Sequence, residues 1–318
     1  MEGFKLIATG GARPGRLVTN EELSKTVDTS DEWISTRTGI RQRYFCTPEQ
    51  NAATLAIEAA QQALERSGLS PAQIDCCVCA TLSGPTASPS VACQVQRALG
   101  LPENRPAFDV NAACSGFIYG TAAAHGLLTT LGGRYALVIG CEALSRLMDP
   151  TDRSTCVLFG DGAGAVVFEL SSDTVFAVSL GARGDDAIRV GGPNPSGSEP
   201  IQMDGKAVFR FAVSALPLCL NEVLGKAQLT LDDLDWVVCH QANSRIIDHC
   251  VRHLGANPAK FYKNMDRFGN TSAASIPVAL NEMAETGLLV PGQTLGCIGF
   301  GGGLTWGGML LQYKGVKQ

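Results

Sequence analysis

The chain has 318 residues, 45% hydrophobic and 17% charged, and its 25 basic and 30 acidic side chains give a net charge of −5. That is enough for one large globule or two ordinary domains with a sizeable core. With no long run of like charge, no general nucleic-acid-binding surface is expected. We find no apolar run long enough to span a membrane and, because Glu2 interrupts the N-terminus, no signal peptide, so we expect a cytoplasmic protein without membrane insertion.

The first clear elements are an amphipathic helix at 51–67 and a buried strand at 76–80. Gly68 follows the helix in the position that commonly ends one. Three of the 12 cysteines lie in or beside this strand, where a free thiol packs as a small hydrophobic group. Cys76 and Cys79 have Cys-x-x-Cys spacing, but no second pair stands at zinc-site distance, so we expect no metal.

The same order of elements recurs in the second half of the chain. Ile74 precedes the first buried strand as Leu234 precedes a strand at 236–239, an offset of 160 residues. Two more landmarks repeat at offsets of 155 and 159 residues, namely Leu99-Gly100 with Leu254-Gly255 and Gly133 with Gly292. Alternating helices and strands with this repeat predict an α/β fold of two related halves, 1–170 and 171–318. A site built at the seam would draw residues from both halves.

Cys114 is the first candidate for chemistry. A strand is predicted at 106–110 and a small-residue helix at 115–131, which places Cys114 at a strand-to-helix turn. The free N–H groups and dipole of a helix N-terminus stabilise an anion, so we expect a lowered thiol pKa and a usable nucleophile. The alternative is one more packed cysteine among the 12.

His240 is the most informative of the four histidines. It follows the buried strand 236–239 and precedes a helix that starts near Asn243, at the end of a strand where α/β proteins place working side chains. His125 falls within an apolar helix and is expected to be packed. His249 and His253 share one helix face without a further ligand, so we expect a solvated pair.

Two later segments complete the candidate site. Asn270 precedes a helix, where it could act as the N-cap or as a hydrogen-bond donor in a site. The glycine-rich run 299–308 is followed by a strand at 309–313, so it lacks the context of a dinucleotide-binding loop. Its backbone N–H groups could instead form an oxyanion hole.

Taken in order, these segments resemble the thiolase superfamily, and specifically the beta-ketoacyl-acyl carrier protein synthase III family. The resemblance runs essentially end to end. It includes SDEWI (30–34), TRTGI (36–40), NAACSGF (111–117), DPTDR (149–153), FGDGAGA (159–165), HQAN (240–243), GNTSA (269–273) and FGGG (300–303). The resemblance implies a duplicated thiolase-like fold, layered α-β-α-β-α, with two mixed sheets related by pseudo-twofold symmetry.

The family also implies a two-stage reaction that needs no cofactor. Cys114 takes an acyl group from an acyl-CoA primer, and malonyl-acyl carrier protein then loses CO2 and attacks the acyl-enzyme. His240 and Asn270 would donate hydrogen bonds to the enolate, which needs no acidic third member. The N–H groups of Cys114 and Gly302 would form the other oxyanion hole. The pairing of one histidine with one asparagine, where elongating relatives carry two histidines, implies a chain-initiating enzyme.

Substrate contacts follow from the same resemblance. Trp33 and Arg153 would sandwich the adenine of CoA, while Arg37 and Asn243 line the tunnel. Phe300 would disfavour the malonyl carboxylate. Taken alone, Trp33 could equally be a core residue of its short helix. Further residues and partners implied are Arg245 and Arg210 as contacts for an acidic acyl carrier protein, although surface arginines are commonly just solvated, and a homodimer.

Ser88 departs from the family pattern. Many relatives have phenylalanine before the proline of this segment, and that ring, from the neighbouring subunit, floors the primer pocket. Serine would leave room there, so we expect acetyl or somewhat larger or branched primers.

Three other functions remain open at this point. A cysteine peptidase also orders Cys, His and Asn along its chain, but its asparagine orients the histidine and its nucleophile segment differs. A specialised synthase making a quinolone, an ester or a polyketide starter would use the same machinery. A non-enzymatic carrier-binding protein would not need the three polar residues beside the glycine run.

Overall fold

The computed structural model describes residues 3–191 and 199–315. Met1 and Glu2, which belong to the segment considered as a signal peptide, lie outside this described part. Its helices begin and end at strong local signals. In the predicted helix at 51–67, for example, Asn51 caps the first turn through its side chain and Gly68 ends the last turn at φ 69°. The helices are α1 (Asn20–Leu23), α2 (Asp31–Thr38), α3 (Ala52–Ser67), α4 (Val91–Leu99), α5 (Gly116–Leu131), α6 (Arg153–Cys156), α7 (Gly205–Ala227), α8 (Ser244–Leu254), α9 (Met265–Phe268) and α10 (Ser275–Glu285).

Among the described residues, ten strands form one large mixed sheet and four form two small ribbons. The strands are β1 (Gly3–Ala12), β2 (Arg16–Thr19), β3 (Gln42–Phe45), β4 (Cys76–Ala80), β5 (Ala107–Val110), β6 (Tyr135–Glu142), β7 (Gly162–Ser171), β8 (Ala177–Asp185), β9 (Ile188–Arg189), β10 (Gln202–Met203), β11 (Trp236–Cys239), β12 (Phe261–Tyr262), β13 (Thr294–Gly301) and β14 (Gly303–Tyr313). Single-turn 3₁₀ helices are η1 (Pro71–Gln73), η2 (Ala113–Ser115), η3 (Leu144–Arg146), η4 (Leu231–Asp233), η5 (Pro258–Lys260) and η6 (Ser272–Ala274).

The large sheet consists of two sets of strands with the same order. One set runs β1-β7-β6-β4-β5 and the other β8-β14-β13-β11-β12. In each set the first two pairings are antiparallel and the last two parallel. A short parallel pairing of β1 with β14 joins the sets, so the two predicted sheets are connected into one. The strand order therefore shows the predicted duplication.

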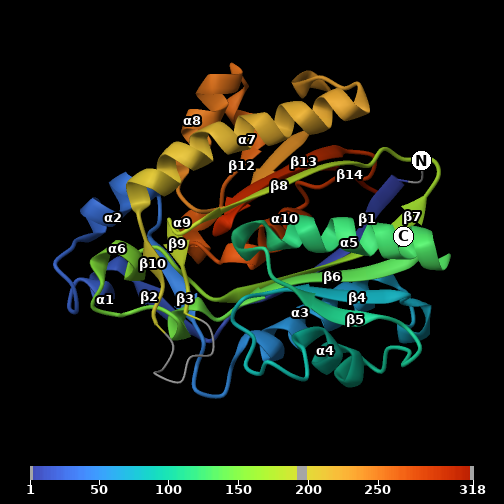
Figure 1. Ribbon diagram of the computed structural model, residues 1–318, viewed down its shortest axis with the longest axis horizontal. Helices are drawn as coiled ribbons and strands as arrows, with labels where there is room; N and C mark the ends of the chain where they lie inside the picture. Colours follow the sequence, from blue (N-terminus) through green and yellow to red (C-terminus); the bar gives the residue numbers. More distant parts are fainter. Residues whose placement is uncertain (1–2, 192–198, 316–318) are drawn as a thin grey trace.

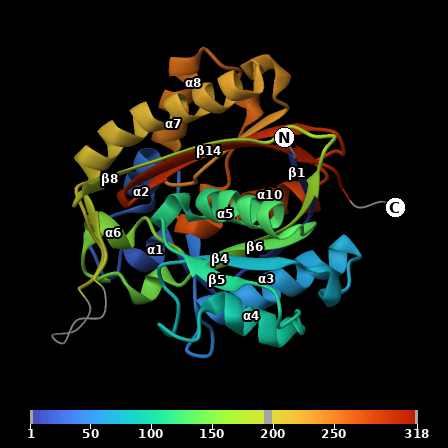
Figure 2. The ribbon, with the colours of Figure 1, turned by 45° about the vertical axis from the view of Figure 1, so that its right-hand side comes forward.

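The helices complete five layers (Figures 1 and 2). Helices α5 and α10 lie side by side between the two sets of strands. Helices α3 and α4 cover the outer face of the first set, and α7 and α8 cover the outer face of the second. Apolar residues of α5 and α10, including Phe117 and Leu280, are fully buried against strands of both sets. The layered thiolase-like fold is confirmed.

The repeated landmarks lie at equivalent places in this duplication. The turns η1 and η4 lead into β4 and β11, and Gly100 and Gly255 end α4 and α8 with left-handed φ values of 66° and 61°. Strand β7 ends at Ser171 and β8 begins at Ala177. The division into 1–170 and 171–318 stays a prediction.

Helix α7 corrects the expectation that no segment could span a membrane. By length and composition alone it is long and apolar enough to do so. Half of its apolar window is buried inside the structure, where Leu216 and Leu220 pack in the core of the second half. We interpret α7 as a core helix, because such helices pass the same test.

Candidate active site

Cys114 lies in η2, the single turn that joins β5 to α5. The turn is strained, because Ala113 adopts a positive φ of 45°. Asn111 Oδ1 accepts the Ala113 N–H at 3.1 Å and helps to hold this conformation. Cys114 is therefore placed at the strand-to-helix turn that the sequence predicts.

The glycine-rich run packs directly against the turn that carries Cys114. A Cβ atom on Gly301 would stand 2.5 Å from the Cys114 backbone nitrogen, so only glycine allows this approach. Thr305 locks the two segments together, since its hydroxyl is 2.9 Å from Ala112 O and 2.7 Å from Ser115 Oγ. Backbone groups of Cys114 and Gly302 thus line the same cavity, and their role as an oxyanion hole stays a prediction.

His240 follows β11 and is 1% exposed. Its Nδ1 lies 2.7 Å from Ser275 Oγ, and the Gln241 N–H donates to that same oxygen at 3.4 Å. When the Ser275 hydroxyl donates its proton to Nδ1, the imidazole proton lies on Nε2. Burial lowers the pKa of His240 to about 3, so the ring is neutral at physiological pH. A neutral Nε2–H is a hydrogen-bond donor and not a cation.

Asn270 does not act as the N-cap of α10. That helix begins at Ser275, after Ala274, and has no side-chain cap. Asn270 Oδ1 instead accepts the Ser272 N–H at 2.9 Å, which leaves the amide nitrogen as a donor. The Asn270 backbone N–H donates to Leu158 O at 2.8 Å and fixes the segment against the first half of the chain.

One cavity of about 500 Å³ brings these residues together. Its lining includes Cys114, His240, Asn270, Phe300 and Gly302. The Phe300 and His240 rings meet edge to face with centroids 5.4 Å apart. The site lies at the seam of the two halves and combines a thiol with two neutral donors.

The pKa of Cys114 differs from the expectation. Burial raises it to about 12, the hydroxyl of Ser272 opposes this rise, and the carboxyl of Glu142 adds to it. The lowered pKa expected from the helix N-terminus is wrong, because removal from water penalises the thiolate more. Cys114 is thus a protonated thiol, and it would have to lose its proton to act as a nucleophile.

Glu142 is a buried carboxyl near Cys114. It ends β6 at 0% exposure, and burial raises its pKa to about 7. Its Oε2 accepts hydrogen bonds from the Ser83 hydroxyl, from the Thr81 hydroxyl at 3.3 Å and from the Leu82 N–H at 3.3 Å. Within residues 3–191 and 199–315, neither the Oε1 atom of Glu142 nor the hydroxyl of Ser272 has a hydrogen-bond partner within ordinary distance.

A second cavity of about 450 Å³ lies next to the first. Shared lining residues, Asn243, Ser154 and Leu158 among them, connect the two. Five basic side chains surround the second cavity together with Trp33: Arg37, Arg153, Lys206, Arg210 and Arg245. The guanidinium groups of Arg37 and Arg153 lie 4.6 and 5.0 Å from the Trp33 ring centroid. A flat base could enter between Trp33 and Arg153 only if the guanidinium moved aside.

Other candidates lie away from this site. Ser88 is on an exposed loop and lines neither cavity of its own chain. His125 packs against the rings of Phe4 and Phe176, with centroids 5.4 and 4.4 Å away. His249 and His253 lie with ring centroids 6.3 Å apart. Within residues 3–191 and 199–315, no three His, Cys, Asp or Glu side chains could together hold a metal.

The sequence interpretation missed Ser275, Thr305 and Glu142. Ser275 and Thr305 fall next to recognised motifs but had no separate signal. Glu142 did have a sequence signal, because a lone acidic residue ends an apolar strand, much as His240 follows one.

Comparison with known proteins identifies relatives along nearly the whole chain. The family model for the 3-oxoacyl-[acyl-carrier-protein] synthase III C-terminal region matches residues 224–313, and a second model of that synthase matches 108–184. A beta-ketoacyl-[acyl-carrier-protein] synthase III from Erythrobacter litoralis is 46% identical over 96% of this chain and 98% of its own.

Solved structures agree with these matches. The crystal structure of 3-oxoacyl-[acyl-carrier-protein] synthase III from Aquifex aeolicus superposes with a TM-score of 0.92 at 42% identity, covering 98% of this chain and 100% of that one. The priming beta-ketosynthase from the R1128 polyketide biosynthetic pathway superposes at 0.93 with 35% identity, covering 98% and 96%.

Proposed function

The chain belongs to the beta-ketoacyl-[acyl-carrier-protein] synthase III family, and we propose that it starts fatty acid synthesis through an acyl-Cys114 intermediate. It is a condensing acyltransferase that joins an acyl-CoA primer to malonyl-acyl carrier protein. The observation that carries the proposed site is the meeting of Cys114, His240 and Asn270 in one cavity, although they lie far apart in the sequence.

The first half-reaction transfers the acyl group. Cys114 loses its proton, its sulfur attacks the thioester carbon, and CoA leaves as a thiol that has gained a proton. The half-reaction is therefore neutral in protons. The high pKa of Cys114 supports a mechanism in which deprotonation accompanies attack, and backbone N–H groups of Cys114 and Gly302 would hold the carbonyl oxygen as it becomes negative.

The second half-reaction forms the carbon–carbon bond. Malonyl-acyl carrier protein loses CO2, and the electron pair left behind becomes an enolate. His240 Nε2–H and the Asn270 amide would donate to its oxygen, and both are neutral, so neither would hold a bound carboxylate by charge. The enolate carbon attacks the acyl-enzyme, Cys114 leaves, and its thiolate regains a proton.

The geometry disfavours a cysteine peptidase. In such an enzyme the asparagine orients the histidine, whereas here Ser275 contacts His240 Nδ1 and Asn270 accepts from Ser272. In the described part of the chain no hydrogen bond joins His240 to Asn270.

Substrate contacts remain proposals. The basic second cavity suits the phosphates of CoA, with Trp33 and Arg153 closing on its adenine after Arg153 moves. Arg245 and Arg210, which also line the second cavity, would contact the acidic carrier protein. We also propose a cytoplasmic homodimer that needs no cofactor. Strand β5 lies at one end of the large sheet with all four residues half-buried, and this edge suits pairing with a second copy.

Primer size belongs to the same proposal. The lining of the first cavity includes aliphatic side chains such as Leu144, Ile188 and Ile201, which suit an acyl chain and not a charged group. We expect acetyl and somewhat larger primers.

The experiment that tests this function is product analysis. Purified protein, acyl-CoA and malonyl-acyl carrier protein should give 3-oxoacyl-carrier protein by mass spectrometry, and Cys114→Ala should give none. CO2 release without a condensed product, or free acid from the primer, would contradict a condensing enzyme.

A second candidate is the priming step of a specialised pathway. The superposition of the R1128 polyketide priming synthase on this chain favours this candidate. Parallel assays with a fatty acid carrier protein and a polyketide carrier protein distinguish the two, since the proposal requires faster turnover with the former.

A further inference from the structure

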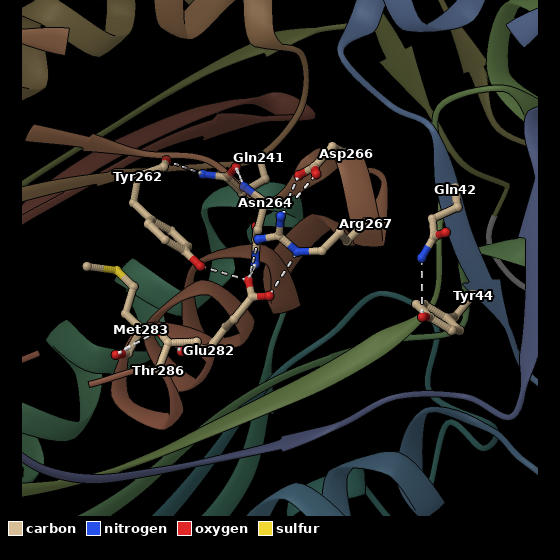
Figure 3. A network of polar contacts seen from close by, with 10 residues as sticks. All are labelled: Gln42, Tyr44, Gln241, Tyr262, Asn264, Asp266, Arg267, Glu282, Met283 and Thr286. Carbon is tan, nitrogen blue, oxygen red and sulfur yellow. Dashed lines mark hydrogen bonds and ion pairs between the residues drawn. The ribbon is translucent and has the colours of Figure 1, made fainter. Parts of the chain in front are cut away.

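A carboxylate outside the cavity joins the two segments that carry His240 and Asn270. Glu282 lies on α10, two helical turns after Ser275, and its side chain is 20% exposed. Figure 3 shows Tyr262, Asn264 and Arg267 pointing toward it. Their donors reach its oxygens at 2.9 Å from Tyr262 Oη, 2.9 Å from Asn264 Nδ2, and 2.9 and 3.0 Å from Arg267 Nε and an Arg267 terminal nitrogen.

One branch of this network ends beside His240. The Asn264 N–H donates to Gln241 Oε1 at 2.9 Å, and Gln241 Nε2 donates to Cys239 O at 2.8 Å and Tyr262 O at 3.2 Å. Gln241 and Asn264 are each 1% exposed, so these bonds are shielded from water. Because Gln241 directly follows His240, the branch fixes the backbone from which the imidazole projects.

The other branch ends beside Asn270. Arg267 belongs to α9, a single turn that Gly269 ends, and Asn270 follows at once. The two-pronged contact of Arg267 with Glu282 restrains rotation of this turn, as paired guanidinium–carboxylate contacts do. The same helix α10 supplies Ser275 to His240, so α10 contacts both segments.

Cys114 is held by other means. Its turn is tied to the glycine run through Thr305 and Ser115, and Asn111 holds Ala113. None of the bonds to the Glu282 carboxylate described above involves these residues. The network therefore divides the site into the nucleophile and the pair of donors.

We propose that Glu282 is a positioning residue for His240 and Asn270 and acts in the decarboxylation and condensation step, but not in acyl transfer to Cys114. This inference rests on the proposed function of the two donors. Loss of the carboxylate would leave Tyr262, Asn264 and Arg267 without their common acceptor and loosen both segments. Displacement of positioned groups by about 1 Å costs on the order of 100-fold in rate, so we expect condensation to fall about 10- to 100-fold.

The test separates the half-reactions in Glu282→Gln, which keeps the side-chain size and removes the charge. The rate of acyl-Cys114 formation from acyl-CoA is measured by quenched-flow intact mass. The isolated acyl-enzyme is then mixed with malonyl-acyl carrier protein, and CO2 and product are followed in a single turnover. We expect acylation at the wild-type rate and slow condensation. Tyr262→Phe, which loses only one hydroxyl, should slow the same step less and keeps the test available if Glu282→Gln unfolds.

Glu285→Gln is the matched control. Glu285 lies about one turn further along α10 and pairs at 2.8 Å with Arg66 of α3, which is not one of the residues that bond Glu282. This change should leave both half-reactions unchanged. A wild-type acyl-enzyme that forms no product would overturn the proposed function itself. With active wild type, equal slowing of both half-reactions in the Glu282 and Tyr262 variants, or no slowing of either, would show that Glu282 has no special role in condensation.

Discussion

Removal of the Ser275 hydroxyl should slow condensation and spare acyl transfer. In Ser275→Ala, His240 Nδ1 loses its partner at 2.7 Å, whose hydroxyl, as donor to Nδ1, would keep the imidazole proton on Nε2. The ring can then carry its proton on Nδ1, and in that tautomer Nε2 cannot donate to an enolate. Ser275 touches neither the thiol nor the glycine run in the contacts described above, so formation of acyl-Cys114 should be unaffected.

The size of the effect follows from the buried hydrogen bond. Leaving a buried polar group unpaired costs about 1–3 kcal/mol. At about 1.4 kcal/mol per factor of ten, condensation should fall about 5- to 150-fold. His240→Ala removes the donor itself and should cost about 100- to 1,000-fold, as for loss of an oxyanion donor. The serine variant should therefore fall between wild type and the histidine variant.

The assay is single-turnover condensation of preformed acyl-enzyme, measured from pH 5 to 9. Because the pKa of His240 is lowered to about 3, no break in the rate near pH 6.5 should belong to this ring. Ser67→Ala is the control, since it removes another buried hydroxyl, which is bonded to Leu64 O at 2.6 Å and lines neither cavity. It should lower the free energy of unfolding without changing either rate. Equal losses in acylation and condensation in Ser275→Ala would refute the tautomer argument.

Three further predictions concern the Glu142 carboxyl, the second cavity and the size of the primer. The pKa of Glu142 is raised to about 7, so its contribution to stability is complete below about pH 4.5 and is lost as the pH rises through 7. Between pH 5 and 8, wild type should lose up to about 3 kcal/mol of unfolding free energy relative to Glu142→Gln; urea unfolding at the two pH values checks this, and a constant difference would contradict it. Arg153→Ala should raise KM for acyl-CoA about 2- to 30-fold, as loss of a cation–π contact predicts, and leave KM for an acyl-pantetheine without adenine unchanged; equal effects on both would remove Arg153 from the adenine site. Ser88→Phe should narrow the range of primers in a panel of acyl-CoAs, and an unchanged range would mean that Ser88 does not reach the primer pocket of a partner subunit.

Local patterns were sufficient to predict much of the fold. Each repeated landmark is a short sequence signal, such as the glycines that end α4 and α8. Because the same signals recur in the same order in both parts of the chain, they predicted duplicated halves. The expectation that no segment is long and apolar enough to span a membrane failed for α7, because a helix covering a sheet can be as apolar as a membrane span. Composition alone cannot distinguish the two environments.

The candidate site was likewise predictable only in part. Cys114, His240 and Asn270 could be proposed because each ends a strand or precedes a helix, in segments that match a family. The partners that set their chemistry could not, because those contacts join distant positions: Ser275 lies 35 residues from His240, and Ser83 lies 59 from Glu142. The pKa of Cys114 also depends on burial, which only the packed structure defines.

The most direct test of the central claim is the intact mass of the protein after brief incubation with a panel of acyl-CoAs, followed by peptide mapping. The account predicts a mass increase of one acyl group on the Cys114 peptide, its absence in Cys114→Ala, and its disappearance when malonyl-acyl carrier protein is added. No adduct from any acyl-CoA, or an adduct on another residue, would contradict a CoA-primed synthase that uses Cys114.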